Sequence, residues 1–278
     1  MRKTKLGISS FCYPFAVGVA GFEPVHRMTA KGLLEEAVRL DVPVVQFGDN
    51  LPLDLLMEME LKALSEYAEE RELKIEVGTR GLTEENIYRY LKIAHRLNSD
   101  LLRVVIDLKE YEPEKEEIIK VIKNVLPALK ENNCVLGIEN HDRFPSYVYA
   151  DIMRTIDSSY VGIVLDTVNS FGCEENTRQV MNELAEYTVC FHVKDFKIAR
   201  IPNAMGFEVT GTKAGDGFLD IPSMMEELKR KSKRDFSTIL ELWMHPEKEI
   251  ETTIEKEKLW VEKSIDFLKQ YVINTNDQ

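Results

Sequence analysis

The sequence predicts an α/β protein in which residues 1–278 form one domain, a single (β/α)8 barrel. Short runs rich in β-branched residues recur along the chain, and each is followed by an amphipathic stretch of helical period. Most of these runs start about 27–38 residues apart, which is the length of one βα unit. No low-complexity linker divides the chain, and such barrels often use ~250 residues in one domain.

Eight of these runs are expected to form strands. Several of them, such as CVLGI and VGIVL, are apolar on both faces, which is typical of strands packed between helices and a filled barrel interior. A doubly wound sheet is the alternative, but it usually has fewer strands and one ligand site at its switch point. In chain order the expected strands are Lys5–Ser9, Pro43–Phe47, Lys74–Val77, Leu101–Ile106, Cys134–Glu139, Val161–Asp166, Val189–Lys194 and Thr238–Leu242.

Helices are expected after each strand, where apolar residues recur every three to four positions. They are Lys31–Leu40, Pro52–Arg71, Glu84–Leu97, Glu114–Asn132, Ser146–Asp157, Glu174–Tyr187, Pro222–Lys231 and Glu247–Tyr271. The widest gap between strands contains Phe196–Asp220, which is expected to be a long loop. Loops of that length are commonly lids or binding loops.

The chain is acidic, with 36 Lys and Arg against 48 Asp and Glu and a formal net charge of −12. A field of that sign repels nucleic acid and anionic membranes, so neither is expected as a partner. The apolar stretches are interrupted by charge and are far shorter than the ~20 residues that span a bilayer. No signal peptide is recognised, and the four cysteines stand singly, as in reduced cytosolic proteins. We therefore expect a cytoplasmic protein.

The last four predicted strands each end in a side chain that can bind a metal: Glu139, Asp166, His192 and Glu241. One such residue is commonly a helix cap or a satisfied core group. Four inward-pointing ionisable groups, however, would be costly to bury without a cation. Three carboxylates and an imidazole suit Mn²⁺, Mg²⁺ or Co²⁺ better than a structural zinc site. We expect one divalent ion, Mn²⁺ in the first place, with Mg²⁺, Co²⁺ or Zn²⁺ as alternatives.

Five segments resemble, in order along the chain, the xylose isomerase-like TIM barrel superfamily of sugar and sugar-phosphate isomerases and epimerases. They are GIENH, GIVLDTVNS, CFHVKDF, GTKAGDGFLDIP and ILELW. The resemblance implies that the same four residues hold one metal, and that Glu139 and Glu241 also act catalytically on opposite faces of the substrate. The DNA-repair branch carries a histidine three residues after the aspartate, where this chain has Asn169. DNA incision is therefore not expected, and Asn169 becomes a candidate for substrate binding.

The ligand set implies enediolate chemistry. A divalent cation that chelates a carbonyl oxygen and its neighbouring hydroxyl acidifies the adjacent C–H, and a carboxylate can remove that proton. The first hypothesis is therefore a metal-dependent isomerase or epimerase of a small sugar or sugar derivative. The alternative is a lyase that removes CO₂ from a 3-oxo sugar acid, because ENHDRF and LDTVNSFG are similar to decarboxylases of the oxo-isoapionate type. A non-catalytic sugar-binding barrel is a third hypothesis, which nothing in the sequence favours.

Other polar residues close to the strand ends are candidates for substrate binding. Lys194 follows His192 by two residues, so both face the same side, where an unpaired ammonium is costly to bury. Arg103 interrupts an apolar run and needs a buried partner or a ligand. His141 could contact a substrate oxygen or orient a metal ligand. Arg80 and Arg200 could supply the positive field that an acid or phosphate needs, although a surface salt bridge is the commoner role of a single arginine.

The expected partner is thus a small sugar or sugar acid. The sequence leaves open which sugar it is, whether it is phosphorylated, and the oligomeric state, with a homo-oligomer compatible.

Overall fold

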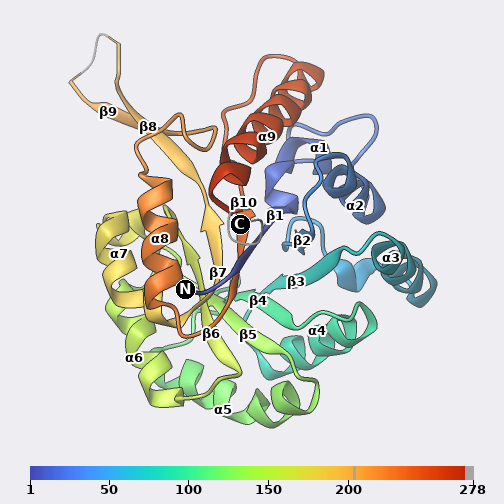
Figure 1. Cartoon of the computed structure of the whole chain (residues 1–278), viewed down its shortest axis with the longest axis vertical. Coiled ribbons are helices and arrows are strands. Elements are labelled where there is room, and N and C mark those ends of the chain that lie inside the picture. The colour runs from blue at the N-terminus through green and yellow to red at the C-terminus, as the bar shows by residue number, and fades with distance from the viewer. Residues whose placement is uncertain (203–204, 273–278) are drawn as a thin grey trace.

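The computed structural model describes residues 1–202 and 205–272, and it confirms the (β/α)8 barrel (Figure 1). Eight parallel strands close in the order β1-β10-β7-β6-β5-β4-β3-β2. Their bounds are β1 Thr4–Ser9, β2 Val44–Phe47, β3 Lys74–Arg80, β4 Leu101–Val105, β5 Val135–Glu139, β6 Val161–Asp166, β7 Thr188–Val193 and β10 Phe236–Leu240. Each lies within a few residues of its predicted run.

The helices form a ring around the strands (Figure 1). They are α1 Pro14–Val17, α2 Ala30–Arg39, α3 Glu58–Glu70, α4 Glu84–Arg96, α5 Lys115–Glu131, α6 Ser146–Ile156, α7 Thr177–Leu184, α8 Ile221–Lys231 and α9 Ile250–Val272. Side-chain caps begin several of them: Thr29 accepts from the amide of Gly32 and Thr83 from that of Asn86. No helix among the described residues is both long and apolar enough to cross a bilayer.

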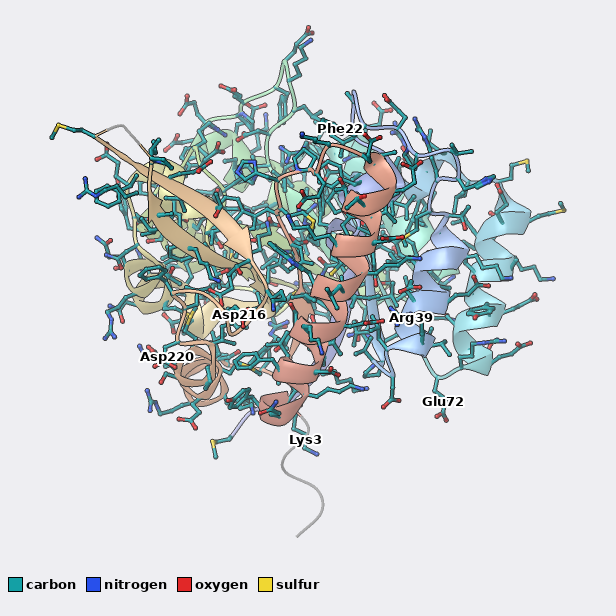
Figure 2. The ribbon with its side chains drawn as sticks, turned by 90° about the horizontal axis from the view of Figure 1, so that it is seen from above. Lys3, Phe22, Arg39, Glu72, Asp216 and Asp220 are labelled. Carbon is teal, nitrogen blue, oxygen red and sulfur yellow. The ribbon has the colours of Figure 1, made fainter. Side chains whose placement is uncertain are left out.

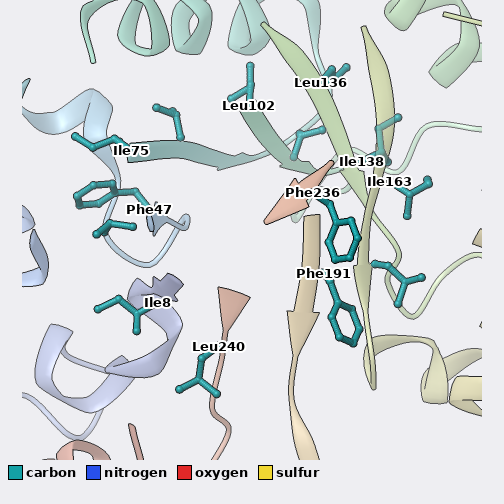
Figure 3. Close-up of a cluster of buried hydrophobic side chains, with 14 of the residues drawn as sticks. Ile8, Phe47, Ile75, Leu102, Leu136, Ile138, Ile163, Phe191, Phe236 and Leu240 are labelled. Atoms are coloured by element: carbon teal, nitrogen blue, oxygen red, sulfur yellow. The ribbon is translucent and has the colours of Figure 1, made fainter. Parts of the chain in front are cut away.

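The buried apolar side chains form two clusters, on the two faces of the strands. One cluster lies between strands and helices and includes Ile8, Phe47 and Phe191 (Figure 3). The other includes Val44, Val164 and Ile239 and fills the lower barrel interior. Since side chains alternate along a strand, the inward rows continue towards the C-terminal edge with polar residues. The site is therefore built on the same rows as the inner core.

The predicted loop Phe196–Asp220 is wrong as a loop, because an antiparallel hairpin occupies much of it. Strands β8 Asp195–Arg200 and β9 Phe207–Thr212 pair along their full length, while residues 203–204 lie outside the described residues. Figures 1 and 2 show the hairpin reaching outward beyond the helices. In the hairpin Ile198 stands opposite Val209.

The base of the hairpin is held by close backbone contacts. Asp195 accepts hydrogen bonds from the amides of Gly215, Gly217 and Leu219, at 3.0, 3.0 and 3.2 Å. A Cβ at Gly211 would lie only 1.8 Å from the carbonyl oxygen of Trp243, so this position accepts only glycine.

Candidate metal centre

The four predicted metal ligands meet at the C-terminal edge of the barrel. Glu139, Asp166 and His192 each offer a ligand atom, and these atoms lie within 4.8 Å of one another. The fourth, Glu241, follows the end of β10 directly, and its Oε1 lies 3.4 Å from His192 Nδ1. The same nitrogen lies 3.5 Å from Glu139 Oε2 and 3.8 Å from Asp166 Oδ2. One imidazole nitrogen thus faces three carboxylates.

The hydrogen bonding of these atoms fits a bound cation. All four side chains are at most 1% exposed. Asp166 Oδ2 and Glu241 Oε2 are buried and have only the ion-pair contact with Lys194 among the described residues, while His192 Nδ1 is buried with no hydrogen-bond partner among them. Buried polar atoms are normally satisfied, so an unpaired imidazole nitrogen that faces three carboxylates fits a bound cation. An oxygen-rich set with one imidazole suits a divalent metal of intermediate hardness.

Lys194 enters this cluster as a counter-ion. Its Nζ lies 2.8 Å from both Asp166 Oδ2 and Glu241 Oε2, as ion-pair contacts, and 3.4 Å from Asn169 Oδ1. Burial by itself would lower the pKa of Lys194, but the carboxylates raise it well above its usual range. The ammonium therefore stays charged, and its side chain is still 14% exposed towards the mouth of the barrel.

Arg103 pairs with Glu139. Its Nε donates to Glu139 Oε2 at 2.5 Å, and another guanidinium nitrogen lies 2.9 Å from Asp49 Oδ1. Asn169 donates from Nδ2 to the other oxygen, Glu139 Oε1, at 2.8 Å. Burial would raise the pKa of Glu139, but the charge of Arg103 outweighs it and holds the pKa well below its usual range. Glu139 is thus a carboxylate that holds a proton poorly.

Three residues of this site were missed in the sequence. Ser9 donates to Glu241 Oε1 at 2.9 Å, Gln46 contacts His192 Nε2 at 2.6 Å, and Asp49 binds Arg103. Gln46 carried a signal, because it is a polar residue inside the buried run VVQF, just as Arg103 is inside LLRVV. Ser9 is the last residue of β1 and Asp49 follows β2 by two residues, where polar residues are too common to single out.

The structure does not bring every predicted substrate residue to the cluster. The ring of His141 pairs with Asp142, and Arg80 pairs with Asp49 at 3.0 Å at the rim. Arg200 lies at the outer end of β8, exposed, with its guanidinium 4.9 Å from the ring centre of Phe207. Lys194, Arg103 and Asn169 are the candidates that contact the ligand set.

Comparison with known proteins identifies the family of this chain. The family model described as xylose isomerase-like TIM barrel matches residues 34–271. The chain belongs to this family. A curated relative, the 3-oxo-isoapionate decarboxylase of Pectobacterium atrosepticum, is 28% identical over 236 residues, which cover 85% of this chain and 86% of that protein.

Solved structures share the barrel at lower identity. The D-psicose 3-epimerase of Clostridium cellulolyticum H10, solved with D-tagatose, has a TM-score of 0.71 at 14% identity, covering 97% of this chain and 99% of that one. The IOLI protein with a bound zinc atom has a TM-score of 0.67 at 18% identity, covering 96% and 99%. These two likenesses show that the fold is shared.

Proposed function

We propose that this family member is a divalent-metal-dependent decarboxylase of a 3-oxo sugar acid. The observation that carries the proposal is the pair of buried cations at the ligand set, Arg103 on Glu139 and Lys194 between Asp166 and Glu241. Together they favour an anionic substrate and disfavour proton storage on the carboxylates.

Glu139, Asp166, His192 and Glu241 would hold the metal, with Mn²⁺ proposed first and Mg²⁺, Co²⁺ or Zn²⁺ as alternatives. When bound, the cation supplies a Lewis acid that draws electrons towards a ketone oxygen. The unpaired His192 Nδ1 supports a metal site because a neutral imidazole nitrogen suits transition metals such as Zn²⁺, while the three carboxylates suit Mn²⁺ and Mg²⁺.

Decarboxylation requires little from a base at this site. The C–C bond to the carboxylate breaks, its electron pair moves towards the ketone oxygen, and CO₂ leaves without any proton being taken from carbon. Proton exchange by two glutamates would instead require Glu139 to hold a proton in turn, which its ion pair with Arg103 opposes. Lys194 can attract the substrate carboxylate and stabilise the negative charge that develops on oxygen.

The decarboxylase relative supports the substrate class. It matches the chain over most of its length, and that protein acts on a 3-oxo sugar acid by its name. A β-keto acid is also the substrate in which a ketone oxygen can take up the electrons released by CO₂ loss. We therefore take 3-oxo-isoapionate as the first compound to test.

Isomerase or epimerase activity is the second candidate. The observation that favours it is that Glu139 and Glu241 both lie next to His192 Nδ1, at 3.5 and 3.4 Å, so two carboxylates border one reaction centre. In that reaction the substrate would exchange a C–H proton with solvent and lose no carbon.

The two candidates are separated by incubating Mn²⁺-loaded protein in D₂O with 3-oxo-isoapionate and, in parallel, with ketoses. With a substrate labelled in its carboxyl group, decarboxylation predicts that the label is released as CO₂. It also predicts one deuterium at the carbon that lost the carboxyl group. Deuterium exchange on ketoses without CO₂ release would refute the proposal. Lys194→Met should lower CO₂ release by about 100-fold or more, whereas Lys197→Met, an exposed lysine on β8, should leave it unchanged.

A further inference from the structure

A hydrogen bond crosses the barrel interior and reaches the imidazole of the metal centre. His192 on β7 and Gln46 on β2 lie on strands that are not neighbours, since β10 and β1 separate them in the barrel. Nevertheless Gln46 Oε1 lies 2.6 Å from His192 Nε2, and both side chains are at most 1% exposed. This contact is on the ring nitrogen that faces away from the carboxylates.

The orientation of the Gln46 amide is fixed from below by Glu76 on β3. Gln46 Nε2 donates to Glu76 Oε2 at 3.0 Å, and Ser237 Oγ donates to the same oxygen at 3.0 Å. Lys74 Nζ lies 3.5 Å from the other oxygen, Glu76 Oε1. Every partner of this carboxylate is a donor, so the amide must turn its NH₂ group to Glu76 and its carbonyl to His192.

That orientation selects one tautomer of the histidine. A carbonyl oxygen only accepts hydrogen bonds, so His192 Nε2 must carry the hydrogen. In a neutral imidazole the other nitrogen then has a free lone pair. This lone pair is on Nδ1, the orphaned atom between Glu139, Asp166 and Glu241.

We propose that Gln46 and Glu76 are positioning residues that preset His192 as an Nδ1 metal ligand before any metal arrives. A buried carboxylate inside a barrel is costly. Glu76 is paired with Lys74, whose Nζ also lies 2.7 Å from the exposed Asp100. Residues that orient a ligating histidine typically contribute about 10–100-fold to metal affinity. The inference rests on the metal site of the proposed function but not on which reaction that site catalyses.

The first test reads the tautomer directly in the metal-free protein. The chain has five histidines, so ¹⁵N-histidine labelling gives a small set of ring signals, and His192→Gln assigns the one of interest. At about pH 9, where an ordinary imidazole is neutral, His192 should show the Nε2–H tautomer. An Nδ1–H tautomer or an imidazolium would overturn the inference, whatever substrate the enzyme uses.

The second test changes the orientation of the amide. Glu76→Gln lets the Gln46 amide flip, and Gln46→Met removes the acceptor, so both should shift His192 away from a pure Nε2–H state. Each should weaken Mn²⁺ binding in calorimetry by about 10–100-fold. Ser237→Ala is the matched control, because it removes one donor to Glu76 and leaves the amide orientation in place. The Mn²⁺ affinity of Ser237→Ala should stay within about threefold of that of the wild type.

Circular dichroism and a thermal melt establish that each variant is folded. If either folded variant keeps both the wild-type tautomer and the wild-type Mn²⁺ affinity, the positioning role is refuted. Loss of activity with unchanged tautomer and affinity would also refute it, since it would show that these residues act on the reaction and not on the ligand.

Discussion

Replacement of Arg103 by methionine removes the buried guanidinium that compensates Glu139. Arg103 is 3% exposed and Glu139 is 1% exposed, with 2.5 Å between Nε and Oε2. Removing one partner of a buried ion pair costs about 3–5 kcal/mol, because the remaining charge is left uncompensated. Asp49 adds little, since its side chain is 25% exposed and keeps Arg80 at 3.0 Å.

We therefore expect Arg103→Met to lower the free energy of unfolding of the metal-free protein by about 3–5 kcal/mol at pH 7. At ~2–4 °C per kcal/mol this is roughly 6–20 °C in Tm. The measurement is calorimetry or urea unfolding in the presence of a chelator. Arg80→Met is the control, because Arg80 pairs with the same Asp49 but is 36% exposed, and it should cost less than about 1 kcal/mol.

The destabilisation caused by Arg103→Met depends on pH. The folded pKa of Glu139 lies below its ordinary value of 4.5, so the ion pair contributes stability above about pH 4.5 and loses it as the pH falls towards the folded pKa. The difference in free energy of unfolding between wild type and Arg103→Met should therefore become smaller below about pH 4.5.

A second substitution tests the reasoning by rescue. In the double variant Arg103→Met/Glu139→Gln the carboxylate charge is gone, so stability should come within about 1 kcal/mol of Glu139→Gln alone. If Arg103→Met costs no more than Arg80→Met, or if Glu139→Gln brings no rescue, the electrostatic account of this site is refuted.

Three further outcomes are expected. Burial raises the pKa of Glu257 to about 7, so this group stabilises the fold fully below about pH 4.5 and loses that contribution, roughly 3 kcal/mol, as the pH rises through 7. Glu257→Gln should therefore remove the fall in Tm over this pH range, and an unchanged fall would contradict the prediction. Lys194→Met should tighten Mn²⁺ binding by about tenfold in calorimetry, since the metal no longer competes with an ammonium 2.8 Å from two carboxylates; weaker binding would contradict this competition. Gly211→Ala would place a Cβ 1.8 Å from the Trp243 carbonyl oxygen, so it should lower the free energy of unfolding by about 1–3 kcal/mol and expose the hairpin to proteolysis. Gly206→Ala should do neither, because the nearest atom to its Cβ would be 3.4 Å away.

The repeating βα pattern was sufficient to predict the barrel, because each strand is a short buried run with its own helix. The hairpin was not predicted. Its outer residues, such as Ile198 and Phe207, are exposed, so burial could not mark them as strand residues. Only the pairing of β8 with β9, which is a contact between two segments, establishes that they are strands.

The candidate ligands could be predicted because they share a position relative to their strands. Glu139 and Asp166 end β5 and β6, and Glu241 comes one residue after β10. Lys194 and Arg103 were predicted to matter because a charged side chain in a buried strand needs a partner. The sequence did not show which residue that partner is. The contact of Arg103 with Glu139 depends on the pairing of β4 with β5, where Arg103 stands opposite Gly137, two residues before Glu139.

By itself, the sequence determined the eight strands and the four metal-competent groups close to successive strand ends. The tertiary structure alone decided which inward side chains stand at the same height. The height of each residue depends on the pairing register of all the strands between two positions, which no single strand contains. Through the registers of β2, β1, β10 and β7, Gln46 meets His192 across the interior. Arg200, eight residues after His192 in the sequence, instead lies at the end of a hairpin that leaves the barrel (Figure 1).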